Sequence, residues 1–127
     1  EGDDSYDTFE MINLATGRGG WFHQFGGLSC PVYLWACAYF QPGTVNCGFD
    51  VWLERASFTK NCTACTLELS TRDCARDALV LAALCPGTRV RAVLGGTVLP
   101  CTERAPGAWE VTVPHGLKNA VVELRPE

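Results

Sequence analysis

Hydrophobic and polar residues alternate along much of the chain in short stretches that are separated by turn residues. The clearest stretch is residues 65–70, where Cys65, Leu67 and Leu69 share one side and polar residues share the other. A period of two residues is typical of a β-strand with one face on the core and one in solvent. The same alternation recurs in residues 89–94, 109–113 and 120–125. The last third of the chain is therefore predicted to consist of strands and turns.

Two runs before residue 60 are rich in aromatic residues. Residues 32–40 are apolar on both faces, which predicts a central, buried strand. Residues 48–54 alternate, with Phe49 and two aliphatic residues on the side that is predicted to face the core. Pro42-Gly43 lies between the two runs and is a strong turn signal, so the runs are predicted to form a hairpin.

Residues 74–85 are ambiguous. Their alanine and leucine content favours a helix, whereas a short apolar run that ends at Pro86-Gly87 is consistent with a buried strand. Because strands are predicted on both sides, we favour a loop or one helical turn followed by a strand. A short helix near residues 72–80 remains the alternative.

Together these segments predict an all-β fold, a disulfide-rich antiparallel β-sandwich or jelly roll of seven to nine short strands. A chain of 127 residues is expected to form one domain over residues 1–127. Residues 1–20 are acidic and end in glycines, so this segment is expected to be partly flexible.

Three segments between residues 87 and 125 carry a resemblance to a known group of domains. They are Val90-Arg91-Ala92-Val93-Leu94-Gly95, Trp109-Glu110-Val111-Thr112-Val113-Pro114 and Ala120-Val121-Val122-Glu123-Leu124-Arg125. In their rhythm of strands and turns they resemble the closing strands of carbohydrate-active accessory sandwiches, such as the C-terminal domain of α-L-fucosidases. The resemblance covers under a third of the chain, and the cysteines have no counterpart in it.

The cysteines indicate that the predicted sandwich is extracellular. All eight lie between residues 30 and 101, at Cys30, Cys37, Cys47, Cys62, Cys65, Cys74, Cys85 and Cys101. An even number at this density is typical of an oxidising compartment, where each disulfide contributes roughly 2–4 kcal/mol. Asn61-Cys62-Thr63 also matches the N-glycosylation pattern, so Asn61 is a candidate glycan acceptor. We expect a secreted protein or an ectodomain, present here as a processed mature chain or an excised piece.

The pairing of the cysteines is left open by the sequence, since eight cysteines allow about 105 connectivities. A bridge from Cys37 to Cys47 across the predicted hairpin is the best single guess. Cys62 and Cys65 have the spacing of a redox dithiol, but they precede a strand rather than a helix, which favours structural disulfides. A zinc site made by Cys62, Cys65, Cys74 and Cys85 would lack a second close pair, so no metal or other cofactor is expected.

Charge and motifs exclude several classes of function. The net charge is −4 and no basic run exists, which argues against nucleic acid as a partner. The longest apolar runs fall far short of the roughly 18–20 residues that span a membrane. The two imidazoles, His23 and His115, lie in no hydrolase motif, and the carboxylates have no distinguishing context; the candidates for a glycosidase pair are Asp50, Glu54, Glu68 and Glu110.

Exposed aromatic residues are the positive signal for binding, because they anchor protein interfaces and stack on sugar rings. We single out Trp52, which shares a strand face with Asp50 and Glu54, together with Trp21 and Tyr39. The expected function is a non-enzymatic extracellular binding or assembly domain of cell-surface, matrix, viral-envelope or secreted-modulator type. A carbohydrate-binding module is the first alternative, with a glycan in place of a protein as ligand. A small secreted hydrolase is the second.

Overall fold

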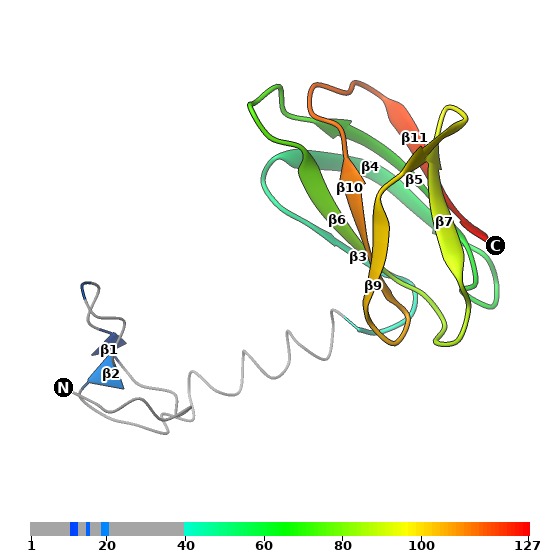
Figure 1. Cartoon of the computed structure of the whole chain (residues 1–127), viewed down its shortest axis with the longest axis horizontal. Helices are drawn as coiled ribbons and strands as arrows, with labels where there is room; N and C mark the ends of the chain where they lie inside the picture. The colour runs from blue at the N-terminus through cyan, green and yellow to red at the C-terminus, as the bar shows by residue number, and fades with distance from the viewer. Residues whose placement is uncertain (1–10, 13–14, 16–18, 21–39) are drawn as a thin grey trace. The chain divides into compact units, whose positions relative to one another are not determined.

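The computed structural model describes residues 11–12, 15, 19–20 and 40–127 (Figure 1). The chain divides into two units, residues 1–38 and residues 39–127. In the first unit, strands β1 (Met11–Ile12) and β2 (Gly19–Gly20) pair in antiparallel fashion. The strand expected over residues 32–40 lies outside the described residues except for Phe40, so the hairpin that it would form with residues 48–54 stays a prediction. Most of the acidic N-terminal segment also lies outside them. The prediction of one domain over residues 1–127 stays a prediction.

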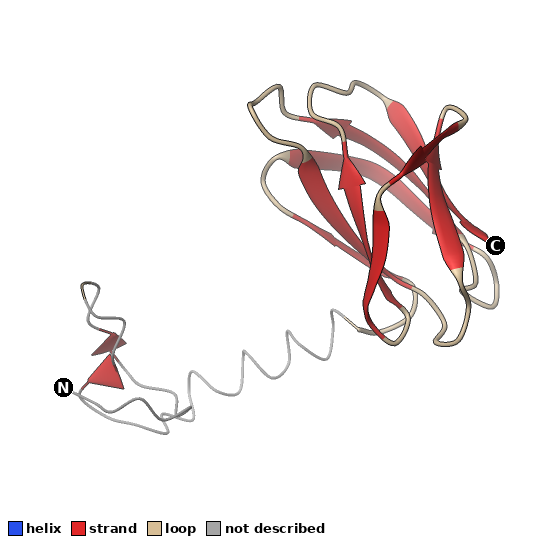
Figure 2. Cartoon of the chain, in the orientation of Figure 1, coloured by secondary structure: helices blue, strands red, loops and turns tan. Residues whose placement is uncertain are grey.

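The second unit is a β-sandwich of nine antiparallel strands, and Figure 2 shows its two sheets lying face to face. One sheet has four strands in the order β3-β6-β10-β9 and the other has five in the order β4-β5-β11-β7-β8. The strands are β3 (Thr44–Cys47), β4 (Val51–Phe58), β5 (Cys65–Thr71), β6 (Ala78–Ala83), β7 (Val90–Leu94), β8 (Thr97–Leu99), β9 (Cys101–Ala105), β10 (Ala108–Val113) and β11 (Ala120–Pro126). The predicted all-β sandwich of seven to nine strands is confirmed.

The core follows directly from the two-residue period. In β5, Cys65, Leu67, Leu69 and Thr71 are all buried, while the residues between them are partly exposed. Strand β10 in the opposite sheet turns Trp109, Val111 and Val113 inward in the same way. Full burial of each large aliphatic side chain stabilises the fold by about 1.5–3 kcal/mol. The alternation predicted for both strands is confirmed.

Residues 72–80 do not form a helix, so that alternative was wrong. Strand β6 begins at Ala78 and pairs with β3 on one side and β10 on the other. Neighbours on both sides satisfy the backbone of β6, and this outweighs the helix propensity of alanine and leucine. The apolar run arises because Ala78, Val80 and Ala82 fill the core while Leu79 lies exposed on the outer face.

The inward side of β4 was predicted correctly at Val51 and Leu53 and wrongly at Phe49. Val51 is buried and Leu53 packs against the core. The Val51 N–H donates to the Gly48 carbonyl oxygen (3.2 Å), so a turn precedes β4 and Phe49 belongs to that turn. Phe49 is consequently fully exposed rather than buried.

Buried polar contacts join the strands at the chain reversals. The Thr71 hydroxyl donates to the Pro114 carbonyl oxygen (2.7 Å) and accepts from the Leu117 N–H (2.9 Å). This side chain therefore ties the end of β5 to the connection between β10 and β11. Thr71 is itself buried, so both hydrogen bonds are needed to offset the loss of hydration.

The turn between β9 and β10 depends on a close backbone approach at Gly107. The Leu84 N–H donates to the Gly107 carbonyl oxygen at 2.7 Å. A Cβ atom on Gly107 would lie only 2.3 Å from the Leu84 carbonyl oxygen, and the φ angle of Gly107 is +80°. Both the conformation and the space at this position require glycine.

Gly107→Ala is expected to destabilise the protein much more than Gly96→Ala. Gly96 has a similar φ of +90°, but a Cβ atom added there would meet no atom within 4 Å, so it isolates the conformational cost of about 1 kcal/mol. Steric displacement of the Leu84 backbone adds to this cost at Gly107, for a total of about 3 kcal/mol or more. Urea unfolding of both variants at fixed redox conditions measures the difference, and equal losses would contradict the close approach.

Candidate binding surface and cysteine sites

Trp52 lies on the outer face of β4, the first strand of the five-stranded sheet. Its neighbours Val51 and Leu53 turn toward the core, so the indole projects away from it and is 70% exposed. The residue opposite it on β5 is Ser70. A large aromatic ring is thus held in solvent on a rigid strand, as an interface anchor would be.

Phe49 adds a second exposed ring just before the same strand. We call Phe49 and Trp52 the β4 aromatic pair. The Arg72 N–H donates to the Asp50 carbonyl oxygen (2.8 Å), which fixes the backbone between the two rings. Sequence reasoning missed the exposure of Phe49, although Gly48 and Asp50 on either side of it are turn residues and could have signalled it. The other binding candidates, Trp21 and Tyr39, lie outside the described residues.

Strand β4 carries features that hinder the addition of another strand. The pairing with β5 shifts between Leu53 and Arg55, a β-bulge that leaves Glu54 without a direct partner on β5. Glu54 and Arg55 are both exposed, and the Arg55 guanidinium lies 4.0 Å from the Glu68 carboxylate. Bulges and charges of this kind protect a strand from edge-to-edge pairing. The exposed aromatic side chains of β4, rather than its backbone, are therefore the groups available for a contact.

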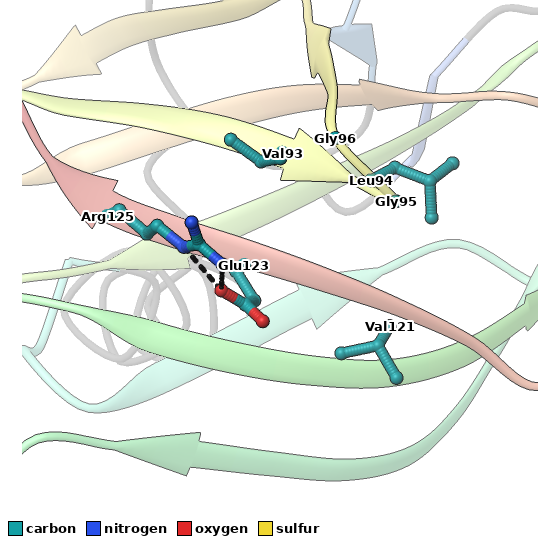
Figure 3. Close-up of a pocket in the computed structure, with 7 residues that line it drawn as sticks. All are labelled: Val93, Leu94, Gly95, Gly96, Val121, Glu123 and Arg125. Atoms are coloured by element: carbon teal, nitrogen blue, oxygen red, sulfur yellow. Dashed lines mark hydrogen bonds and ion pairs between the residues drawn. The ribbon is translucent and has the colours of Figure 1, made fainter.

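Three hollows on the described part of the surface are small and open. They have volumes of about 280, 300 and 330 Å³, at the lower end of the roughly 300–1,000 Å³ of typical small-molecule sites. Figure 3 shows the one lined by Val93, Gly95, Gly96 and Val121, where Glu123 and Arg125 form an ion pair. Because these two charges neutralise each other, the hollow offers little to orient a polar ligand.

The carboxylates considered for catalysis are divided between the two sheets. Asp50 precedes β4, Glu54 and Glu68 belong to β4 and β5 of the five-stranded sheet, and Glu110 belongs to β10 of the four-stranded sheet. Glu68 faces outward from the five-stranded sheet, whereas Glu110 lies on the outer side of the four-stranded sheet and binds Arg104 at 2.7 Å. The two carboxylates are thus on opposite faces of the sandwich and cannot flank one glycosidic bond. His23 lies outside the described residues.

His115 is exposed in the turn that follows β10. Its Nδ1 lies 3.4 Å from an Asp73 carboxylate oxygen, and both side chains are solvent-accessible. The neighbouring Cys74 thiol donates to the Arg76 carbonyl oxygen at 3.3 Å and not to the imidazole. The contacts therefore resemble a surface ion pair, with no nucleophile directed at the histidine.

The described cysteines fall into distinct environments, and each is a free thiol in the structure: Cys47, Cys62, Cys65, Cys74, Cys85 and Cys101. Burial raises the pKa of Cys65 to about 12 and that of Cys101 to about 11. A redox dithiol needs a lowered pKa, so the shift at Cys65 is opposite to what that chemistry requires. Cys30 and Cys37, and with them the predicted Cys37–Cys47 bridge, lie outside the described residues.

A zinc site shared by Cys62, Cys65, Cys74 and Cys85 does not form. Cys74 precedes β6 and Cys85 follows it, so a six-residue strand of about 20 Å separates the two thiols. Across residues 40–127 and the shorter described segments, no group of three or more histidine, cysteine or acidic residues is placed to hold a metal ion.

Asn61 lies exposed in the loop between β4 and β5. The Thr63 hydroxyl donates to the Asn61 side-chain oxygen at 2.9 Å. The Thr59 hydroxyl accepts from the Thr63 and Ala64 N–H groups at 3.1 and 3.2 Å, which holds the loop in shape. The acceptor amide is accessible in the folded protein, and its use as a glycan acceptor stays a prediction.

No family model, no curated protein and no solved structure matches this chain. The described residues contain no helix that is long and apolar enough to cross a membrane. The surface and the chemistry of the chain itself are therefore the basis for a proposed function.

The buried Cys65 thiol predicts a pH dependence for the reduced protein. The pKa of Cys65 rises to about 12 on folding, from about 8.5 in an unfolded chain. The folded state thus holds a proton that the unfolded state releases, so stability is fully present below about pH 8.5 and falls as the pH rises toward 12. Urea unfolding of reduced wild-type protein between about pH 8 and 10 should show this fall.

Cys65→Ala should flatten part of that pH dependence, while Val98→Ala, which removes an exposed side chain that does not titrate, should leave it unchanged. Comparison of the two variants cancels the titration of all other groups. An identical slope in wild type and Cys65→Ala would contradict the burial of this thiol.

Proposed function

We propose that this chain is a non-enzymatic extracellular binding or assembly domain that contacts a protein partner through the β4 aromatic pair. The observation that carries the proposal is the 70% exposure of Trp52 on a strand whose alternate residues are packed in the core. The same sandwich buries Trp109 to 8% exposure, so its core does accommodate tryptophan. Tryptophan is enriched among the residues that dominate binding energy at interfaces.

The extracellular part of the proposal is supported by the eight cysteines and by the exposed acceptor at Asn61. Disulfides persist in secreted and surface-displayed proteins and are rare in a reducing cytosol. A cell-surface, matrix, viral-envelope or secreted-modulator protein would provide that setting. We accordingly propose that the cysteines form disulfides and that Asn61 carries a glycan.

A protein partner is favoured over a small substrate by the shape and chemistry of the surface. The three hollows are open, and Glu68 and Glu110, two of the carboxylates that a glycosidase could use, lie on opposite faces. A flat, aromatic-bearing strand suits a broad interface, in which a few buried anchors supply most of the affinity.

A carbohydrate ligand is the second candidate, because the Trp52 ring stands beside the hydroxyl-bearing Ser70 on the outer face of the sheet. Aromatic rings on a sheet stack on sugars, and nearby hydroxyl groups can hydrogen-bond to them. The two candidates differ in what destroys binding.

Trp52→Ala should weaken binding of the oligomerised full chain to cell surfaces by at least about tenfold, equivalent to about 1.4 kcal/mol. Val98→Ala is the matched control, since Val98 is 62% exposed on β8, the strand at the opposite edge of the same sheet. Flow cytometry over a concentration series measures both variants, with circular dichroism to verify folding.

The treatment of the cells separates the candidates. Loss of binding after protease treatment, with glycosidase treatment harmless, supports a protein partner. Binding to arrayed glycans that Trp52→Ala abolishes would replace that proposal with the carbohydrate-binding module. Equal binding of Trp52→Ala and wild type to cells would overturn the role of the β4 aromatic pair in either case.

Expression through a eukaryotic secretory pathway should yield a protein that carries one N-linked glycan at Asn61. Asn61→Gln and Thr63→Ala should each remove the same electrophoretic shift, because the acceptor pattern needs both residues. Thr59→Ala removes the hydrogen bonds that hold the loop in shape but leaves the acceptor pattern intact, so this variant should retain the glycan. An enzyme-resistant, unshifted wild-type protein would count against glycosylation at this site.

A further inference from the structure

We infer that two disulfides of the sandwich join Cys62 to Cys85 and Cys65 to Cys101. The inference goes beyond the proposed function, because it selects specific partners among the cysteines. The inference and the proposed function have one requirement in common, which is that the protein folds in an oxidising compartment. Each pair is carried by its own observation: a backbone contact for the first and facing core positions for the second.

Cys62 and Cys85 are held side by side although they are far apart in sequence. The Cys85 N–H donates to the Cys62 carbonyl oxygen at 2.8 Å. With standard backbone dimensions, one bond of this length keeps the two α-carbons within about 6.7 Å of each other, which is inside the range seen in disulfides. The backbone is therefore already at bridging distance.

The surroundings of Cys62 favour the same bridge. The Cys62 sulfur lies 3.7 Å from where a Cβ atom on Gly43 would stand, and the Gly43 N–H donates to the Ala83 carbonyl oxygen at 2.9 Å. The sulfur thus lies close to Gly43, which is hydrogen-bonded to Ala83 at the end of β6, two residues before Cys85. Cys62 also has a φ of +53°, a backbone conformation that residues other than glycine rarely adopt. A cross-link would hold the backbone of Cys62 in this conformation.

Cys65 and Cys101 face the same core from opposite sheets. Cys65 belongs to β5 in the five-stranded sheet, and Cys101 belongs to β9 in the four-stranded sheet. Cys65 is a member of the buried core cluster, and Cys101 packs against that cluster. Burial is the main cause of the raised pKa of Cys65, and the charge of an ionised Cys101 adds to it, in keeping with two residues that face the same core. A bond between them would fasten one sheet to the other.

Formation of each bridge is a two-electron oxidation. Two thiols lose two protons and two electrons to an oxidant, and a disulfide such as oxidised glutathione accepts them by exchange and leaves as two thiols. The buried, protonated Cys65 is a poor nucleophile in the folded reduced protein. Its bridge should therefore form while the chain folds and the thiol is still accessible.

These two pairs would leave four cysteines, Cys30, Cys37, Cys47 and Cys74. Four cysteines allow about three connectivities, in place of the roughly 105 that eight allow. Cys62 and Cys65 would then belong to two separate bridges, although only two residues lie between them.

The test is a peptide map of the full chain, refolded with oxidised and reduced glutathione, alkylated without reduction and digested with trypsin. Any N-linked glycan is removed first. Residues 61–72 carry both Cys62 and Cys65, residues 77–89 carry Cys85 and residues 92–104 carry Cys101. The expected product is a cluster of these three peptides that separates on reduction. Fragmentation of the cluster between Cys62 and Cys65 assigns each partner in the wild-type protein.

Paired serine variants give an independent assignment. Cys62→Ser with Cys85→Ser should leave residues 61–72 joined only to residues 92–104, and Cys65→Ser with Cys101→Ser should leave them joined only to residues 77–89. The crossed control, Cys62→Ser with Cys101→Ser, should abolish both native bridges and leave Cys65 and Cys85 alkylated.

A link from residues 61–72 to the Cys74 peptide or to the peptide that contains Cys47 would overturn the inference. So would a wild-type cluster in which Cys62 is bonded to Cys101. Because the wild-type map involves no variant, failure of a variant to fold leaves the result readable. It is also independent of binding, so loss of the proposed partner contact and loss of this pairing are distinguishable outcomes.

Discussion

The two-residue period of β5 is the constraint on which the rest of the sandwich depends. Four alternate residues of this strand are buried, and its neighbours β4 and β11 pair with it on either side. A shift of the register by one residue would move all four into solvent. The burial of Leu67 and Leu69 therefore also fixes which side of β4 faces out, and with it the position of Trp52 opposite Ser70.

Alternating strands could be predicted from sequence because one face of each strand is exposed to solvent, so the pattern itself indicates which residues face the core. Strand β6 could not be predicted in this way, since Leu79 is exposed and the apolar run has no visible period. Its identity as a strand comes from pairing with β3 and β10, which is a non-local property. Phe49 was misplaced for a local reason: one turn at Gly48–Asp50 moves the start of the strand to Val51.

Of the candidate site, the sequence predicted the residue types but not their neighbours. The spacing of Cys62 and Cys65 suggests one paired site, yet the chain places Cys62 in a loop and Cys65 in the core. Contacts such as that between Cys62 and Cys85 join residues from separate loops, and only the closed sandwich brings them together. The four carboxylates were indistinguishable in sequence for a similar reason, because the sheet that carries each one decides which face it occupies.

The length of β4 separates the contact between Cys62 and Cys85 from the exposed rings of Phe49 and Trp52. Trp52 lies near the start of this strand and Phe58 at its end, and the distance between them is about 20 Å along an extended strand. The loop with Asn61, Cys62 and its contact to Cys85 follows Phe58, whereas Phe49 and Trp52 lie at the other end. A glycan at Asn61 and a bridge beside it would thus stabilise one end of the strand without covering the rings at the other. The proposed cross-links and the proposed binding surface are therefore compatible on one small domain.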